Sequence, residues 1–231
     1  MQLTTLMSAI VNVGSLIFLT VGALLPIVDP VGNAPIYITM TAELTDEQRR
    51  RMAKSVAINS FLLLLASTLV GAYVLDFFGL SIPAVQVTGG VVLFAMGWQM
   101  LNSPNTVPSL ESTDASGYTA EYLGERAFYP MTMPLTVGPG SISVALALGA
   151  NPPQDFRPLL ATAFAHTIGI LIVAVSVYLC DRYAVQIVRK LGPVGTSVVI
   201  RLSAFILLCI GVQIFWNGVR GLVVSAFPVL R

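Results

Sequence analysis

A proline-rich stretch inside a long apolar run constrains the fold of this chain most strongly. Residues 26–35 read Pro-Ile-Val-Asp-Pro-Val-Gly-Asn-Ala-Pro and interrupt the apolar run of residues 10–42. Proline removes a backbone donor and restricts the residue before it, so a helix is expected to break here. In lipid a broken helix is tolerated only where it is buried in protein or lines a cavity. The stretch therefore predicts an interrupted membrane span, with the carboxylate of Asp29 at membrane depth.

A second segment has the same character. Residues 134–141 read Pro-Leu-Thr-Val-Gly-Pro-Gly-Ser, and Pro134 lies 108 positions after Pro26. Breaks at corresponding places in two halves of a chain are typical of secondary transporters, whose binding sites form between the half-helices. The two breaks together favour a transporter.

The composition is that of an integral membrane protein. Hydrophobic residues make up 55% of the chain and charged residues 10%, whereas soluble domains carry about 25% charged residues. The net charge of +1 leaves no basic field for nucleic acid. Cys180 and Cys209 lie in apolar segments without metal-ligand spacing, so no metal or other cofactor is expected. No lysine or arginine precedes Arg49, so the first span is expected to insert as an uncleaved anchor.

Six apolar segments are long enough to cross a bilayer, which takes about 20 residues. Thr45 and Gln48 form a capping-box pattern that starts the second helix. Residues 76–79 predict a tight turn, residues 102–127 a polar cytoplasmic linker, and residues 181–195 a polar, glycine-punctuated connection. The expected spans cover residues 10–42, 55–75, 80–101, 128–150, 158–180 and 198–223.

The two halves, residues 1–101 and 128–231, match each other weakly. Pro26 aligns with Pro134, and Gly97-Trp-Gln99 aligns with Gly211-Val-Gln213. Because each half holds an odd number of spans, the second half enters the bilayer in the opposite sense. The sequence thus predicts an all-α membrane protein, with six transmembrane helices as a 3+3 inverted repeat and helices 1 and 4 broken at mid-membrane.

Basic residues predict the orientation. Nine of the twelve lysines and arginines fall in or beside the connections after spans one, three and five, and three fall on the opposite face. Basic residues favour the cytoplasmic side, so both termini are expected to face outward. Arg201, at the start of span six, is interpreted as a boundary residue on the cytoplasmic side.

The chemistry of the site follows from the inverted breaks. Nine residues follow each break, residues 34–42 and 142–150, and the two half-helices are expected to meet at their N-termini. Helix N-termini expose free N–H groups and attract anions, and Asn33 and Ser141 are expected as their N-caps. Asp29 adds a carboxylate to this site. The matching position in the second half is Val137, so the site is expected to have one carboxylate and not two. A ligand with an anion and a cation a few ångströms apart satisfies both features, and a small neutral amino acid is such a zwitterion.

Three further polar residues are candidates for the cavity or for a proton relay. They are Gln99, His166 and Gln213, which in the plainer interpretation form hydrogen bonds between packed helices.

Four segments resemble the MarC family: residues 29–33, 78–90, 133–140 and 211–218. The resemblance covers nearly the whole chain. It implies a multi-pass protein of the bacterial inner membrane, and some members of the family are described as small neutral amino acid transporters. It does not establish drug efflux. The motif positions that carry over as substrate-binding candidates are Asp29, Pro30, Gly32, Asn33, Pro134, Gly138, Pro139, Gly140 and Ser141.

We therefore expect a secondary transporter or exporter of small neutral amino acids that works by alternating access around a midplane site, and not an enzyme. Without a nucleotide-binding motif, a proton or sodium gradient or simple facilitation is left to drive it. Two alternatives stay open: a non-transporting membrane accessory or scaffold protein, and an intramembrane hydrolase that uses Ser141 or Ser143 with His166. The substrate, the transport direction and any homo-oligomer stay open as well.

Overall fold

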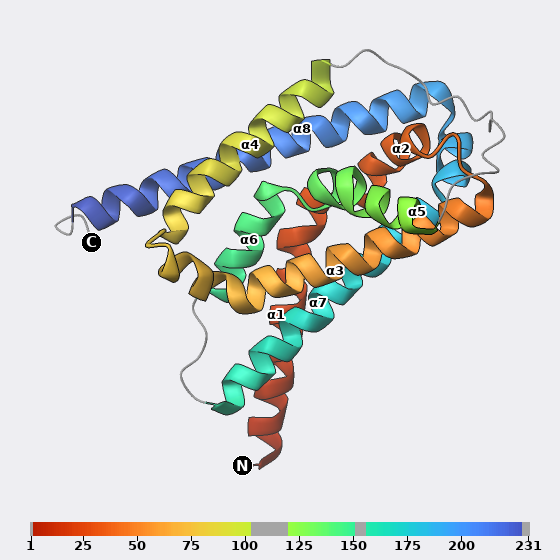
Figure 1. Ribbon diagram of the computed structural model, residues 1–231. Coiled ribbons are helices and arrows are strands. Elements are labelled where there is room, and N and C mark those ends of the chain that lie inside the picture. Colours follow the sequence, from red (N-terminus) through yellow and green to blue (C-terminus); the bar gives the residue numbers. More distant parts are fainter. Residues whose placement is uncertain (1, 103–119, 151–155, 228–231) are drawn as a thin grey trace.

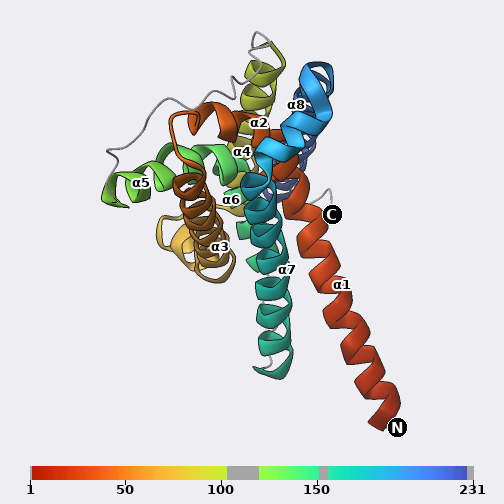
Figure 2. The ribbon, with the colours of Figure 1, turned by 90° about the vertical axis from the view of Figure 1, so that its right-hand side faces the viewer.

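The computed structural model describes residues 2–102, 120–150 and 156–227, and its regular structure is helical throughout (Figures 1 and 2). The helices, in chain order, are α1 (Gln2–Val28), α2 (Pro30–Met40), α3 (Asp46–Phe77), α4 (Ile82–Asn102), α5 (Ala120–Arg126), η1 (Ala127–Thr136), α6 (Pro139–Gly149), α7 (Phe156–Arg182) and α8 (Ala184–Ala226).

Five apolar helical stretches within the described ranges are long enough to cross a membrane, and a bent pair of helices makes a sixth. The two parts of the bent pair meet at 72°. These stretches coincide in place with the six expected spans. The five are Val13–Met40, Asp46–Gly71, Ile82–Asn102, Leu159–Arg182 and Ala184–Ala226, and the bent pair is Leu123–Thr136 with Pro139–Gly149.

Asp29 separates α1 from α2 within the first apolar stretch, Val13–Met40. Its backbone is left-handed (φ 42°, ψ 63°), and its carboxylate caps α2 by accepting a hydrogen bond from the Gly32 N–H. The expectation that Asn33 caps this helix is wrong. Proline at the first helical position is favoured, so α2 begins at Pro30, directly after the aspartate that serves as the better cap.

The second break separates η1 from α6. The backbone of η1 leaves the helical region at Tyr129 and Met133, and α6 begins at Pro139 after an extended Gly138. Ser141 is not the N-cap that was expected, since its hydroxyl donates to the Gly138 carbonyl from inside the first turn. The helices after the two breaks, α2 and α6, are each 11 residues long, two more than expected.

Two local predictions are confirmed. Thr45 and Gln48 make the reciprocal capping box, with the Gln48 N–H donating to Thr45 Oγ1 and the Thr45 N–H to Gln48 Oε1. The turn after α3 contains Gly79 at φ 67°.

The predicted connection 181–195 is helical instead, apart from Tyr183 and the kink at Gly192 (φ 67°, ψ 179°). Ala184 and Val188, one turn apart, are buried in the core, and this burial favours a helix over a loop. Most of the predicted linker 102–127 lies outside the described residues, and its last part forms α5.

Helix α4 packs along α8, α7 lies against α1 and α3, and α6 lies between α3 and α4 (Figures 1 and 2). The largest core cluster of the described residues joins every helix except α4. Glycines allow the close approach of α4 and α8: a Cβ on Gly97 would meet the Ala204 carbonyl at 2.9 Å, and one on Gly211 would meet the Phe94 nitrogen at 2.7 Å. Small residues at such contacts are typical of helix pairs in membranes.

Candidate functional site

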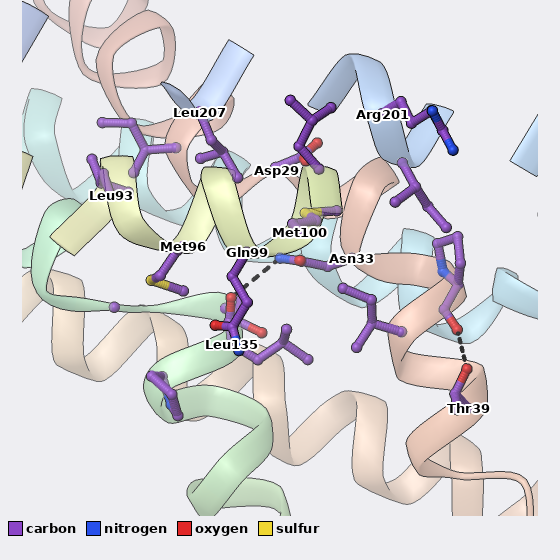
Figure 3. A pocket seen from close by; sticks show the side chains of 18 of the residues that line it. Asp29, Asn33, Thr39, Leu93, Met96, Gln99, Met100, Leu135, Arg201 and Leu207 are labelled. Atoms are coloured by element: carbon purple, nitrogen blue, oxygen red, sulfur yellow. Dashed lines mark hydrogen bonds between the residues drawn. The ribbon is translucent and has the colours of Figure 1, made fainter. Parts of the chain in front are cut away.

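A cavity of about 380 Å³ lies where both breaks come together (Figure 3). Residues of α2, α4, α6, α8 and the end of η1 line it, and the C-terminal end of α1 contributes Ile27. Six of the residues predicted from sequence are among its lining: Asp29, Asn33, Gln99, Pro134, Gly138 and Ser141.

Four other candidates belong to the same helix starts but do not line the cavity. Pro30 and Pro139 occupy the first helical positions of α2 and α6. Gly32 and Gly140 are close-packed, because a Cβ on Gly32 would collide with Asp29 and Ser203, and one on Gly140 with the Leu93 side chain. These residues shape the helix starts rather than contact the cavity.

The two oxygens of Asp29 have different surroundings. Oδ1 accepts a hydrogen bond from the Gly32 N–H at 3.1 Å. Oδ2 is buried, and the Ser203 hydroxyl, which lies beside it over Gly32, is a donor to this carboxyl group. A buried carboxylate oxygen requires a donor, so Oδ2 is a position that either Ser203 or a donor from a ligand stabilises.

Asn33 joins the two halves of the chain. Its Nδ2 donates to the Val28 carbonyl at 2.8 Å and to the Leu135 carbonyl at 3.3 Å, the second bond crossing from α2 to η1 (Figure 3). These bonds satisfy carbonyls that the broken backbone leaves without helical partners. Asn33 thereby holds the two breaks together.

The two helix N-termini at the cavity differ in their caps. Both helices begin with a proline that has no N–H, but the Asp29 carboxylate caps α2. No side chain caps α6, which starts after Gly138. Because the first N–H groups of a helix have no partner within it, the start of α6 is the more favourable place for an anion.

Apolar side chains form much of the remaining wall. Leu93, Met96 and Met100 of α4 face the cavity together with Leu135 and Leu207 (Figure 3). A cavity of this kind, with a few polar groups on an apolar wall, is typical of a small-molecule site. The flexible methionine side chains can adapt to ligands of different shape.

His166 lies outside this cavity. It is buried between α7 and α1, with its Nδ1 at 2.9 Å from the Thr20 hydroxyl. Ser141 and Ser143 donate to the carbonyls of Gly138 and Gly140. The pairing of a serine with His166 that the hydrolase alternative requires is therefore absent from the described contacts.

Gln99 and Gln213, which align with each other in sequence, differ in the structure. Gln99 lines the cavity. Gln213 is exposed, donates to the Asn217 side chain at 3.1 Å, and is not among the lining residues. Within the described part of the chain, no group of three His, Cys, Asp or Glu residues is placed to hold a metal ion.

Comparison with known proteins extends the resemblance seen in the motifs. The description "MarC family integral membrane protein" matches residues 14–223. The chain belongs to the MarC family. A UPF0056 membrane protein of Pyrococcus abyssi is 32% identical over 198 residues, covering 86% of this chain and 91% of that protein. The UPF0056 inner membrane protein MarC of Salmonella paratyphi A is 29% identical over 201 residues, with 85% and 90% covered.

A third MarC relative, the UPF0056 membrane protein YvbG of Bacillus subtilis, is 29% identical over 209 residues, 90% of this chain and 94% of that protein. No solved structure matches the chain significantly. Family membership and the helical spans together make this chain an integral, multi-pass membrane protein.

Part of this MarC-family cavity was not predicted from the sequence. Thr196, Ser197 and Arg201 of α8 line it, as does Thr39 of α2. The signal was present as polar residues at positions 196, 197 and 201, of which 197 and 201 lie on one helical face. These residues were not predicted to line the cavity, because residues 181–195 were expected to form a connection and Arg201 was interpreted as a boundary residue.

Proposed function

We propose that the protein is a secondary transporter of small neutral amino acids, with the cavity between the two breaks as its substrate site. The ammonium group of the amino acid binds Asp29, and its carboxylate binds the N–H groups at the start of α6. A proton or sodium gradient, or the substrate gradient alone, drives the movement. No covalent step is required.

The observation that carries this proposal is the buried Oδ2 of Asp29 in a cavity that an uncapped helix N-terminus also reaches. An ammonium is a donor for the first, and a carboxylate is an acceptor for the second. The apolar wall of Met96, Met100 and Leu135 leaves room for a small side chain. A scaffold protein gives no reason for such a costly arrangement.

The packing supports an inverted repeat, with the two halves related by a pseudo-two-fold axis. Gly97 lies against Ala204 and Leu208, whereas Gly211 lies against Gly90 and Phe94. Along the contact, the residue numbers on α8 decrease as those on α4 increase, so the two helices are antiparallel. An inverted repeat requires this of its corresponding third helices.

The contacts of the helix starts recur between the halves. Gly32, at the start of α2, lies against Ser203 of α8, and Gly140, at the start of α6, lies against Leu93 of α4. Each half thus packs its second helix fragment onto the third helix of the other half. Two halves that exchange contacts in this way support alternating access by rocking about a shared site.

We also infer the orientation. The ends of α2 and α4 and the start of α8 gather on one side of the molecule (Figure 1), where the basic residues concentrate. The positive-inside rule assigns that side to the cytoplasm, with both termini outward, in the inner membrane of a bacterial cell. Arg201 is exposed and lines the cavity, so the cavity opens on the cytoplasmic side.

Counterflow in proteoliposomes tests the proposal. Vesicles loaded with unlabelled alanine, glycine or serine are expected to accumulate labelled alanine through the wild-type protein. Asp29→Asn is expected to slow this uptake at least tenfold, since a hydrogen bond to a charged group contributes about 1.5–3 kcal/mol. Thr88→Val, which removes an exposed hydroxyl bonded to the Ala84 carbonyl, serves as the control and is expected to transport normally.

Two results speak against the proposal. Folded wild-type protein that moves none of the three amino acids favours the scaffold alternative. Equal uptake by wild type and Asp29→Asn removes Asp29 from the site.

A further inference from the structure

Asp181 is a buried acid that the proposed substrate site does not use. It is the penultimate residue of α7 and is 4% exposed, although Arg182 directly after it is exposed. Asp76 is likewise the penultimate residue of α3, and it is exposed. Two acids at the same place in two long helices thus differ in their contact with water. The burial of Asp181 needs a reason, because acids within membrane spans are costly and usually functional.

The Asp181 carboxyl lacks a stabilising donor. Among the described residues none donates a hydrogen bond to it or forms an ion pair with it. Tyr37 of α2 interacts with it electrostatically and is 2% exposed, but the Tyr37 hydroxyl donates to the Arg49 carbonyl at 2.7 Å. A hydroxyl has one proton to donate, so Tyr37 does not compensate the carboxylate. An isolated carboxylate is strongly disfavoured in apolar surroundings unless it binds a cation.

The helices around α7 leave this position open to a small cation. Helix α1 contains no charged residue. Arg49 of α3 makes a salt bridge with Asp46 at 3.0 Å, and Arg189 and Lys190 of α8 are exposed. Metal ions require several oxygen ligands, and the described ranges place no group of three His, Cys, Asp or Glu residues for one. A proton requires a single carboxylate oxygen, so a proton is the cation that fits.

Helix α2 connects Asp181 with the cavity. It packs against α7, and its two faces have different neighbours. Tyr37 is buried in the core on the side of Asp181, whereas Thr39, about 200° further round the helix, lines the cavity (Figure 3). The Cys180 thiol interacts electrostatically with both Asp181 and Asp29. A change of charge at Asp181 therefore acts on the helix that carries the proposed substrate site.

We propose that Asp181 is the binding site of the coupling proton. The carboxylate takes up one proton from the side of the exposed Arg182, becomes neutral, and releases the proton again as the transporter changes state. The neutral carboxyl suits the packing of α2 on α7, and the ionised carboxylate favours a state in which water reaches it. This inference rests on the proposed function and names the driving ion that the proposed function leaves open.

Two assays on the same proteoliposomes test the proposal. In wild-type vesicles, a pH gradient of one of the two signs is expected to drive labelled alanine above equilibrium, and a protonophore is expected to abolish this accumulation. Asp181→Asn has nearly the same size and stays neutral, so it is expected to keep alanine counterflow, which needs no net proton movement, and to lose the accumulation. Asp76→Asn, the same substitution at the exposed acid of α3, is the matched control and is expected to keep both activities.

Four results overturn the proposal. They are a wild-type protein that exchanges alanine but accumulates none under either pH gradient, accumulation driven by a sodium gradient alone, accumulation by Asp181→Asn equal to that of wild type, and loss of counterflow as well in folded Asp181→Asn. The last result would make Asp181 a structural or substrate-binding residue.

Failure here is distinguishable from failure of the transporter proposal. If wild-type protein shows counterflow and the pH gradient or Asp181→Asn gives one of the contrary results, the coupling role alone is wrong. If folded wild-type protein shows no counterflow of any of the three amino acids, the transporter proposal is wrong, and the coupling role of Asp181 is overturned with it.

Discussion

The two carboxylate oxygens of Asp29 have separate tasks, and single substitutions separate them. One oxygen caps α2 through the Gly32 N–H, and the other lies buried at the cavity. Aspartate also tolerates the left-handed backbone better than most residues. Asn shares the capping oxygen and this tolerance, whereas Ala has neither.

The free energy of unfolding of Asp29→Asn is therefore expected to lie within about 0.5 kcal/mol of the wild-type value. That of Asp29→Ala is expected to be about 2–4 kcal/mol lower. The loss combines an N-cap, worth about 0.5–2 kcal/mol, with left-handed strain of about 1–3 kcal/mol. Thermal unfolding in detergent measures both variants. Equal unfolding temperatures for Asn and Ala contradict the capping role.

The paired glutamines give a second prediction for single residues. In protein without Cys180 and Cys209, alkylation of Gln99→Cys is expected to slow when alanine is added, because Gln99 lines the cavity. Gln213→Cys, outside the lining, is expected to react at a rate that alanine does not change. Protection of both positions, or of neither, is inconsistent with the cavity as the alanine site.

Among elements, the pair α4 and α8 depends on glycine. A Cβ on Gly211 would lie 2.7 Å from the Phe94 nitrogen and 2.9 Å from the Gly90 carbonyl oxygen. Both are backbone atoms, so the two helices would have to move apart to make room. Gly22 of α1 has nothing within 4 Å of such a Cβ. The same substitution is therefore expected to have opposite effects at the two sites.

Gly211→Ala is expected to cost about 1–3 kcal/mol by overpacking, whereas Gly22→Ala is expected to be neutral or to gain up to about 1 kcal/mol from better helix propensity. Thermal unfolding in detergent measures whether each substitution lowers or raises the stability. A Gly211→Ala variant as stable as Gly22→Ala would mean that α4 and α8 do not approach closely.

The elements also show how far sequence reasoning reaches. Apolar length predicted the places of the candidate spans, and the prolines predicted that helices end at Asp29 and between η1 and α6. The helix starts were placed too late, because capping preference alone ranks Asn33 and Ser141 highly. It does not anticipate an aspartate in left-handed conformation followed by Pro30. The helical segment after Tyr183 was missed, since its amphipathic burial depends on a core that only the tertiary fold creates.

For the cavity, the sequence predicted residues at the breaks and missed those brought from elsewhere. Asp29, Asn33 and Ser141 were found because chain breaks are local signals. Thr196 and Arg201 were not, because their place in the lining depends on how α8 passes the cavity. Local sequence patterns identify the helix ends at the cavity, whereas the packing of the helices determines which other residues line it.

For the whole molecule, the proposed orientation places Glu47 on the cytoplasmic side and Asp76 on the outside. Both side chains are exposed and lie at opposite ends of α3. In intact cells a membrane-impermeant maleimide is expected to label Asp76→Cys and to reach Glu47→Cys only after permeabilisation. The reverse pattern would invert the orientation and place the cavity mouth outside.

Equilibrium binding of labelled alanine to the purified protein tests most directly whether this cavity is a zwitterion site, because it needs neither a membrane nor a gradient. Saturable binding is predicted for wild type, with affinity at least tenfold lower in Asp29→Asn at an unchanged unfolding temperature. Wild-type protein that binds no alanine, or an Asp29→Asn variant that binds it equally well, would contradict the account.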